Sequence, residues 1–277
     1  MSGVILALLE HPTTAPHTLA AAHNLAARMG HARINVLAIR MPPDATIMPT
    51  EEVLTKRQAI EIRAREQHRV HALHTAFAAW EPTARNPKIA IEWADIEGLA
   101  DALVGEWGRR ADAIVIDRPG RHDGVPDRLC MHAALFDTDR PVLAVPPGPT
   151  AAFGERIAIA WRNDKRTDRA VLASLRLLLP DGQLKGGQLH VLAGVRAGAA
   201  MPVLPEILAE HGIDAVLHVL PIGTGAFGEA LLAKAHAIGA DMLVMGAYTH
   251  HTWRELVLGG VTRYMLAHAD LPVLMRH

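Results

Sequence analysis

Residues 240–277 read ADMLVMGAYTHHTWRELVLGGVTRYMLAHADLPVLMRH and contain one complete structural unit, which decides the fold of this chain. The apolar run 242–245 has the length of a buried strand, and Gly246 ends it with a turn. A helix is predicted over 253–268, followed by a short strand over 271–275. A strand, a glycine turn and a helix N-terminus bring free backbone N–H groups and the positive end of the helix dipole to one point. This stretch therefore predicts a site for an anion or a nucleotide.

The same unit occurs earlier in the chain. The matching segments, in the same order, are 4–8 with 156–161, 111–117 with 240–246, and 141–145 with 272–275. Repeats of this length indicate a duplicated domain, because the units of solenoid proteins are much shorter. The segment 146–149 is rich in Pro and Gly and is the predicted boundary. It divides the chain into one domain at 1–148 and a second at 149–277.

Strands alternate with helices in both halves, which predicts an α/β fold with parallel sheets covered on both faces. Strands are expected at 4–9, 34–39, 88–93, 113–116 and 142–145, and at 156–161, 189–193, 215–220, 242–245 and 273–275. Helices are expected at 13–29, 50–80, 96–110 and 128–136, and at 167–179, 202–211, 225–238 and 253–268. The prediction is two tandem doubly wound five-stranded sheets, with strand order 3-2-1-4-5 or the related 2-1-3-4-5. In the first order a ligand is expected where the carboxyl ends of the first and fourth strands meet.

Composition excludes several classes of protein. The net charge is −1, so no overall field favours nucleic acid or an anionic membrane. A single cysteine, Cys130, rules out an internal disulfide framework and is typical of a reducing compartment. No apolar run reaches the roughly 18 residues that a membrane span needs. The apolar stretch 4–9 has neither a preceding basic region nor a cleavage pattern, so we expect a cytoplasmic protein.

The glycine loop resembles the phosphate-binding motif of the universal stress protein family, and the chain as a whole resembles the tandem form of that family. Nucleotide-binding members have Gly, two residues, Gly, nine residues, then Gly followed by Ser or Thr. Gly246 matches the first glycine and Gly259 the third. Thr249 stands at the second glycine, and Gly260 stands where Ser or Thr belongs. The resemblance spans the chain and is strongest over 239–275.

This resemblance implies an adenine nucleotide alpha hydrolase-like fold and a nucleotide site in the second half. Trp161 and Arg162 are expected on the base or ribose side, although the family usually places Asp where Arg162 stands, and an arginine cannot accept hydrogen bonds. The expected ligand is ATP or AMP, bound weakly, with Mg²⁺ accompanying ATP. The candidate binding residues are Trp161, Arg162, Asn163, Gly246, Thr249, His250, Gly259, Gly260, Val261 and Thr262.

The first half departs further from the motif. Asp117 replaces the first glycine, and a carboxylate there should repel phosphate. The later glycines are absent over 129–136, although Glu10 lies near the end of the first strand. We therefore expect no ATP binding of the family's kind in this half.

The resemblance also implies that the fifth strand of each half lies at an exposed sheet edge. Residues 142–145 and 273–275 are then expected to pair with each other, because unpaired edges invite aggregation. The chain would be an internal pseudo-dimer. A homodimer of such chains stays open at this point.

Other candidate sites have simpler interpretations. His68, His71 and His74 recur at a spacing of three, as metal ligands on a helix can, but no Cys or carboxylate completes the set, so a polar helix flank is favoured. Solvated side chains are favoured for His250 with His251, and for the basic cluster Arg162, Lys165, Arg166 and Arg169. A structural role is favoured for Cys130.

No Walker motif, nucleophile elbow or catalytic triad spacing is present in the sequence. The leading hypothesis is a binding and regulatory module rather than an enzyme. Two alternatives stay open: a nucleotide-free interaction or scaffold protein with an unknown protein partner, and a slow ATPase that uses His250 or Asp164 to orient water.

Overall fold

The computed structural model describes residues 3–46, 55–84, 86–119, 125–148, 152–162, 165–179, 188–247 and 260–277. The first half contains β1 (Gly3–Leu8), α1 (Ala15–Met29), β2 (Ala32–Arg40), η1 (Pro43–Thr46), α2 (Lys56–Trp80), η2 (Glu81–Ala84), β3 (Ile89–Glu97), α3 (Ala100–Arg109), β4 (Ala113–Asp117), α4 (Val125–Phe136) and β5 (Val142–Val145). The second half contains β6 (Arg156–Trp161), α5 (Lys165–Leu178), β7 (Gln188–Val195), α6 (Glu206–Glu210), β8 (Val216–Pro221), α7 (Phe227–Ala237), β9 (Met242–Gly246), α8 (Gly260–His268) and β10 (Val273–Arg276).

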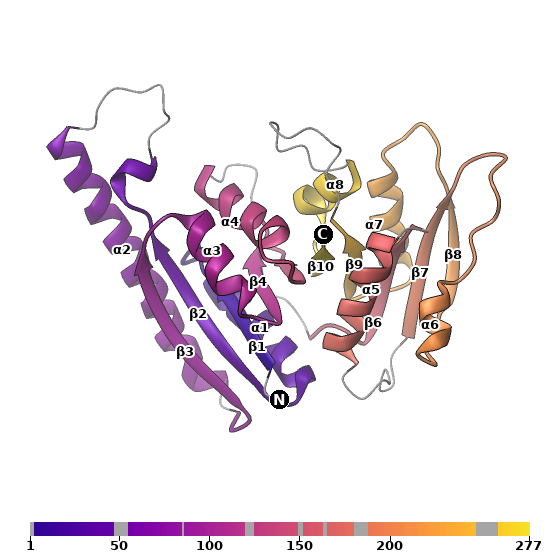
Figure 1. Ribbon diagram of the computed structural model, residues 1–277, viewed down its shortest axis with the longest axis horizontal. Coiled ribbons are helices and arrows are strands. Elements are labelled where there is room, and N and C mark those ends of the chain that lie inside the picture. Colours follow the sequence, from indigo (N-terminus) through magenta and orange to yellow (C-terminus); the bar gives the residue numbers. More distant parts are fainter. Residues whose placement is uncertain are drawn as a thin grey trace.

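All ten strands form one sheet, in the order β3-β2-β1-β4-β5-β10-β9-β6-β7-β8 (Figure 1). Each half has the predicted order 3-2-1-4-5, and its strands pair in parallel. The only antiparallel pair among the described strands joins β5 to β10, in the register Val273↔Ala144, Leu274↔Leu143 and Met275↔Val142. The predicted fold class and the pairing of the two fifth strands are thus confirmed.

Helices cover both faces of this sheet. Side chains of α1, α2, α5 and α6 pack on one face with Ile5, Leu143, Val244 and Leu274. Side chains of α3, α4, α7 and α8 pack on the other face with neighbouring strand residues. Because successive strand side chains point to opposite faces, a strand buried on both sides must be apolar throughout, as 242–245 is. Both cores continue across the β5–β10 junction, where α1 also contacts α5.

Helix α2 begins at Lys56, later than the predicted start at Thr50. Thr55 forms a reciprocal cap, in which its Oγ1 accepts from the Gln58 N–H at 3.3 Å and Gln58 Oε1 accepts from the Thr55 N–H at 3.0 Å. Such a capping box satisfies two backbone donors at a helix start and marks it sharply. Residues 47–54 lie outside the described part of the chain.

Two other predicted helix starts are wrong. The helix predicted from Ile96 begins at Ala100, because β3 pairs with β2 as far as Glu97↔Arg40. The helix predicted over 202–211 spans only Glu206–Glu210, since Pro205 restricts the residue before it to extended backbone. The described part of the last helix is Gly260–His268, and its predicted start at 253 lies outside the described residues and stays a prediction. Within the described residues, no helix is both long enough and apolar enough to cross a bilayer.

Candidate nucleotide site

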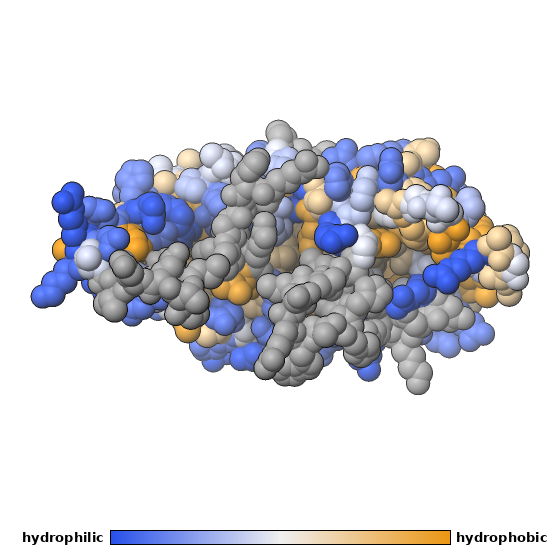
Figure 2. All heavy atoms as spheres, turned by 90° about the horizontal axis from the view of Figure 1, so that it is seen from above, coloured by the Kyte–Doolittle hydropathy of each residue, from blue (hydrophilic) through white to orange (hydrophobic). Residues whose placement is uncertain are grey.

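A cavity of about 980 Å³ opens at the carboxyl ends of β6, β7 and β9 in the second half. It lies where β6, the first strand of this half, runs beside β9, the fourth strand. In a doubly wound sheet the connections leave these two strands in opposite directions, which creates a crevice for a ligand. Figure 2 views the molecule from above, toward the carboxyl ends of the strands.

Six of the predicted binding residues line this cavity together: Trp161, Arg162, Gly246, Gly260, Val261 and Thr262. Trp161 ends β6, and Gly246 ends β9. Gly260 is the first described residue of α8 and lines the cavity. The other four predicted residues, Asn163, Thr249, His250 and Gly259, lie outside the described part of the chain, as do Asp164 and His251. The function of all ten stays a prediction.

Gly260 and Thr262, two residues of α8 that line the cavity, differ in their exposure to solvent. Gly260 is exposed, and a side-chain carbon added there would meet no atom within 4 Å. Thr262, two residues on, is buried. A ligand could therefore approach the backbone at Gly260 closely, while Thr262 lies deeper in the structure.

The outer wall of the cavity was not foreseen from the sequence. It is formed by residues 200–207, together with Ile222, Phe227 and Leu231. Gly194, near the end of β7, lets two of these side chains pack closely, because an added side-chain carbon would lie 2.6 Å from Phe227 and 2.8 Å from Ile222, which would then have to shift. The signal was the uncharged run 199–205, which begins four residues after β7 ends at Val195 and overlaps the predicted helix 202–211.

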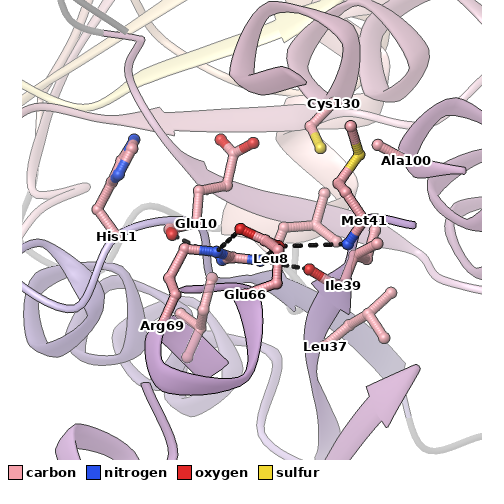
Figure 3. A pocket seen from close by; sticks show the side chains of 11 residues that line it. Leu8, Glu10, His11, Leu37, Ile39, Met41, Glu66, Arg69, Ala100 and Cys130 are labelled. Carbon is pink, nitrogen blue, oxygen red and sulfur yellow. Dashed lines mark hydrogen bonds and ion pairs between the residues drawn. The ribbon is translucent and has the colours of Figure 1, made fainter. Parts of the chain in front are cut away.

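The corresponding place in the first half holds a much smaller cavity of about 140 Å³ (Figure 3). Arg69 and Glu66 of α2 lie across the carboxyl ends of β1 and β2. The Arg69 guanidinium donates to the Glu10 carbonyl at 2.9 Å and also to the Ile39 carbonyl. It donates twice to the Glu66 carboxylate, at 3.2 and 2.9 Å. Glu66 also accepts from the Met41 N–H at 3.2 Å.

Asp117 ends β4 in the first half, where Gly246 ends β9 in the second. Its carboxylate is buried and accepts a hydrogen bond from the Thr14 hydroxyl at 2.7 Å, at the start of α1. The carboxylate that stands in place of the glycine therefore binds the start of α1. The absence of ATP binding in the first half stays a prediction.

The other candidate residues are the three histidines of α2 and Cys130. His68, His71 and His74 are exposed on α2, and the ring of His74 lies 5.1 Å from that of Trp93. Within the described residues, no three His, Cys, Asp or Glu side chains come together as a metal site. Cys130 is buried, forms no disulfide and lines the small first-half cavity.

A histidine pair was missed by the sequence reasoning. His190 Nδ1 and His218 Nε2 lie 3.0 Å apart on the neighbouring strands β7 and β8. Burial lowers the pKa of His190 below its ordinary value, and the charges of His218, Arg156 and Lys234 lower it further. Burial, then the charge of Lys234, lowers the pKa of His218. Because neither residue lines the large cavity, the pair belongs to the sheet and not to the candidate site.

Comparison with known proteins supports the family resemblance. Residues 183–277 match the model of the universal stress protein family. No curated protein matches the chain significantly. A universal stress protein from Archaeoglobus fulgidus DSM 4304 has a TM-score of 0.69 at 16% identity, over 100% of this chain and 96% of that one.

Two further structures share the fold. A functionally unknown protein from Pseudomonas aeruginosa PAO1 has a TM-score of 0.58 at 15% identity, over 99% of this chain and 92% of that one. The cytoplasmic domain of a prokaryotic cation chloride cotransporter has a TM-score of 0.51 at 11% identity, over 99% and 94%. Since proteins with different roles share this architecture, the fold alone does not assign a function. Residues 183–277 therefore match the universal stress protein family, and the chain shares its fold over its whole length with a universal stress protein of known structure.

Proposed function

We propose that this protein is a binding and regulatory module of the universal stress type, whose second half binds an adenine nucleotide weakly. The observation that supports this best is that one cavity of about 980 Å³ is lined by Trp161, Arg162, Gly246 and Gly260. That volume lies at the upper end of the range for small-molecule sites, about 300–1,000 Å³.

The chemistry of the cavity suits a phosphate-bearing ligand at one end. The backbone N–H groups at the α8 N-terminus and the helix dipole favour an anion there. Arg162 adds a positive charge to the cavity lining. The same arginine cannot accept the hydrogen bonds that an Asp at this position would accept from adenosine, and for this reason we propose weak binding. ATP would bring Mg²⁺ with it, whereas AMP would not need it.

A second candidate function is that of a nucleotide-free interaction protein. It is favoured by the outer wall of the cavity, where Met201 and Val203 are 66% and 73% exposed. Large apolar side chains gathered at a cavity mouth are typical of surfaces that contact a partner.

The test is calorimetric titration of the nucleotide-stripped full chain with ATP and AMP, with and without Mg²⁺. We expect about one nucleotide per chain for the unchanged protein, and loss of binding in Gly260→Asp. Position 260 has room for a side chain, and a carboxylate in the cavity lining repels phosphate. Thermal stability should therefore be kept as binding is lost, which separates the effect from misfolding.

Ala102→Asp is the matched control, because it adds the same charge to the exposed first turn of α3 in the other half. It should bind nucleotide as the unchanged protein does. No saturable heat at millimolar ligand would remove the nucleotide proposal and favour the interaction protein. Equal affinity in Gly260→Asp would show that the nucleotide binds elsewhere and would remove this cavity as its site. Phosphate release above background with Mg²⁺-ATP would instead favour the slow ATPase.

A further inference from the structure

The two outer edges of the ten-stranded sheet are chemically different. Strand β3 forms one edge and carries Glu92, Asp95 and Glu97, with Glu92 and Asp95 paired to arginines of β2. Strand β8 forms the other edge and reads Val-Leu-His-Val-Leu-Pro, without an acidic or basic side chain other than His218. Charges on an edge strand oppose pairing with another strand, and β8 has almost no such protection.

The outward-facing backbone of β8 is also without a strand partner. In the part of the chain that the structure describes, β8 pairs with β7 alone, from His190↔Val216 to Val195↔Pro221. An edge strand leaves alternate N–H and C=O groups pointing away from the sheet, where they can bond another chain. Pro221 removes a donor only at the last residue of the strand.

Exposed apolar side chains are concentrated at the same end of the molecule. Of the seven large apolar side chains that are exposed among the described residues, five come from 201–222. Val216 begins β8 and is 51% exposed, and Ile222 follows the strand directly. In Figure 2 apolar atoms gather toward the end where β7 and β8 lie, whereas the α2 end is mainly hydrophilic. Exposed apolar side chains thus lie at both ends of the open β8 edge, and apolar surface at such an edge is typical of an interface.

We propose that β8 pairs antiparallel with β8 of a second copy of this chain, which forms a two-fold dimer with a sheet that continues across both copies. The chain already joins two edges in this way, since β5 and β10 pair antiparallel between its halves. A two-fold contact brings the same uncharged surface against itself, so it meets no like-charge repulsion. It is also closed, because each copy uses its one unprotected edge.

Two other occupants of this edge are less well matched. Pairing of β8 with β3 of another copy would bring three carboxylates of β3 to an apolar strand and would extend into an open filament. An acidic or basic partner protein would find no charged side chain on β8 to recognise, apart from a histidine whose pKa is lowered.

The test is sedimentation velocity of the full chain from low to high micromolar concentration, together with hydrogen exchange. We expect reversible dimers, and Val216→Lys should raise the dimer Kd about tenfold or more, since lysine on an edge strand disfavours pairing. Ile60→Lys is the matched control: Ile60 is 65% exposed on α2 at the opposite end of the molecule, and the substitution should leave the Kd unchanged.

Hydrogen exchange of the unchanged protein gives a second, independent result. The backbone N–H groups of 216–220 should exchange more slowly as concentration rises, whereas those of the β3 edge, 89–97, should not change. A monomer at every concentration overturns the proposal. So does a dimer in which the β8 exchange rates are independent of concentration, or in which Ile60→Lys weakens the dimer as much as Val216→Lys.

Discussion

At the scale of single residues, Arg69 accounts for the closed first-half site. Its side chain is 24% exposed and replaces solvent at two strand-end carbonyls, those of Glu10 and Ile39. Glu66 accepts two hydrogen bonds from the guanidinium, and these hold it in the orientation in which it donates to the strand-end carbonyls. An arginine on α2 thus occupies the space in the first half that stays open in the second.

Replacing Arg69 should destabilise the protein and expose the cavity. Arg69→Met leaves two carbonyls and the Glu66 carboxylate without the guanidinium, and we expect a loss of about 2 kcal/mol in the free energy of unfolding. Urea unfolding measures this loss. Cys130 lines the same cavity and is the only cysteine, so its reaction with a thiol reagent should become faster.

Arg57→Met is the control for that prediction. Arg57 lies on the same helix and pairs with Glu61 at 3.0 Å, but both side chains are largely exposed. Such surface pairs contribute little, so the change should stay within about 0.5 kcal/mol. Equal effects of the two substitutions, with unchanged Cys130 reactivity, would show that the Arg69 contacts do not hold the site closed.

The histidine pair predicts a loss of stability in acid. Both pKa values are lowered by folding, so near and below the unfolded value of about 6.5 the unfolded chain binds more protons than the folded one. Stability from this pair is therefore complete above about pH 6.5 and falls as the pH decreases toward the lowered pKa values. Protonated His190 would also hold an N–H at the buried Nε2 atom, which has no partner among the described residues.

Urea unfolding at about pH 7.5 and about pH 5.5 tests this prediction, because the two values lie on either side of the ordinary histidine pKa. The double variant His190→Asn with His218→Asn should lose less stability between the two pH values than the unchanged protein. The exposed His31→Asn serves as the control and should keep the full dependence. A double variant with the same dependence as the unchanged protein would refute the assignment.

At the scale of elements, α2 and its counterpart explain why two similar halves differ. Helix α2 has 25 residues and buries Val70, Leu73 and Phe77 only in its second part. Its turn at 66–69 lies over the strand ends of β1 and β2. In the second half α6 has five residues, and an extended apolar segment precedes it. The long helix brings an arginine to the strand ends, whereas the short helix leaves the large cavity open.

At the scale of the whole molecule, the β5–β10 junction makes one sheet from two halves. Leu143 and Leu274 face each other across the junction and are fully or almost fully buried, within the core to which α1 and α5 contribute. We therefore expect the halves to unfold together rather than separately. Coincident transitions by calorimetry and circular dichroism would show such a single cooperative unit.

Leu143→Ala tests the junction directly. It should cost about 2–5 kcal/mol, as buried Leu→Ala substitutions do, and should lower the single transition as a whole. Leu204→Ala, at a position that is 40% exposed, is the control and should cost much less. Two separate transitions, of which Leu143→Ala shifts only one, would mean that the halves are energetically independent.

The sequence by itself determined the α/β class, because apolar runs such as 113–116 and 242–245 and turn residues such as Gly246 specify buried parallel strands wherever they occur. The repeated order of segments indicated the duplication and left two related strand orders, and the pairing of the two fifth strands was predicted from the family resemblance. The place where six candidate site residues meet was predictable from the strand ends together with the glycine motif of that resemblance. The division at residue 148 stays a prediction.

The tertiary structure alone showed how the first-half cavity is filled by the Arg69 and Glu66 side chains. Arg69 is about sixty residues from Glu10 in sequence, and no local pattern relates a charge on α2 to the carbonyls that it contacts. The same holds for His190 with His218, which meet because β7 and β8 pair in one particular register. Which distant side chains interact depends on the register of the strands and on the angle at which a helix crosses the sheet. Both are set by packing of the whole core, so they cannot be read from the sequence around the two interacting residues.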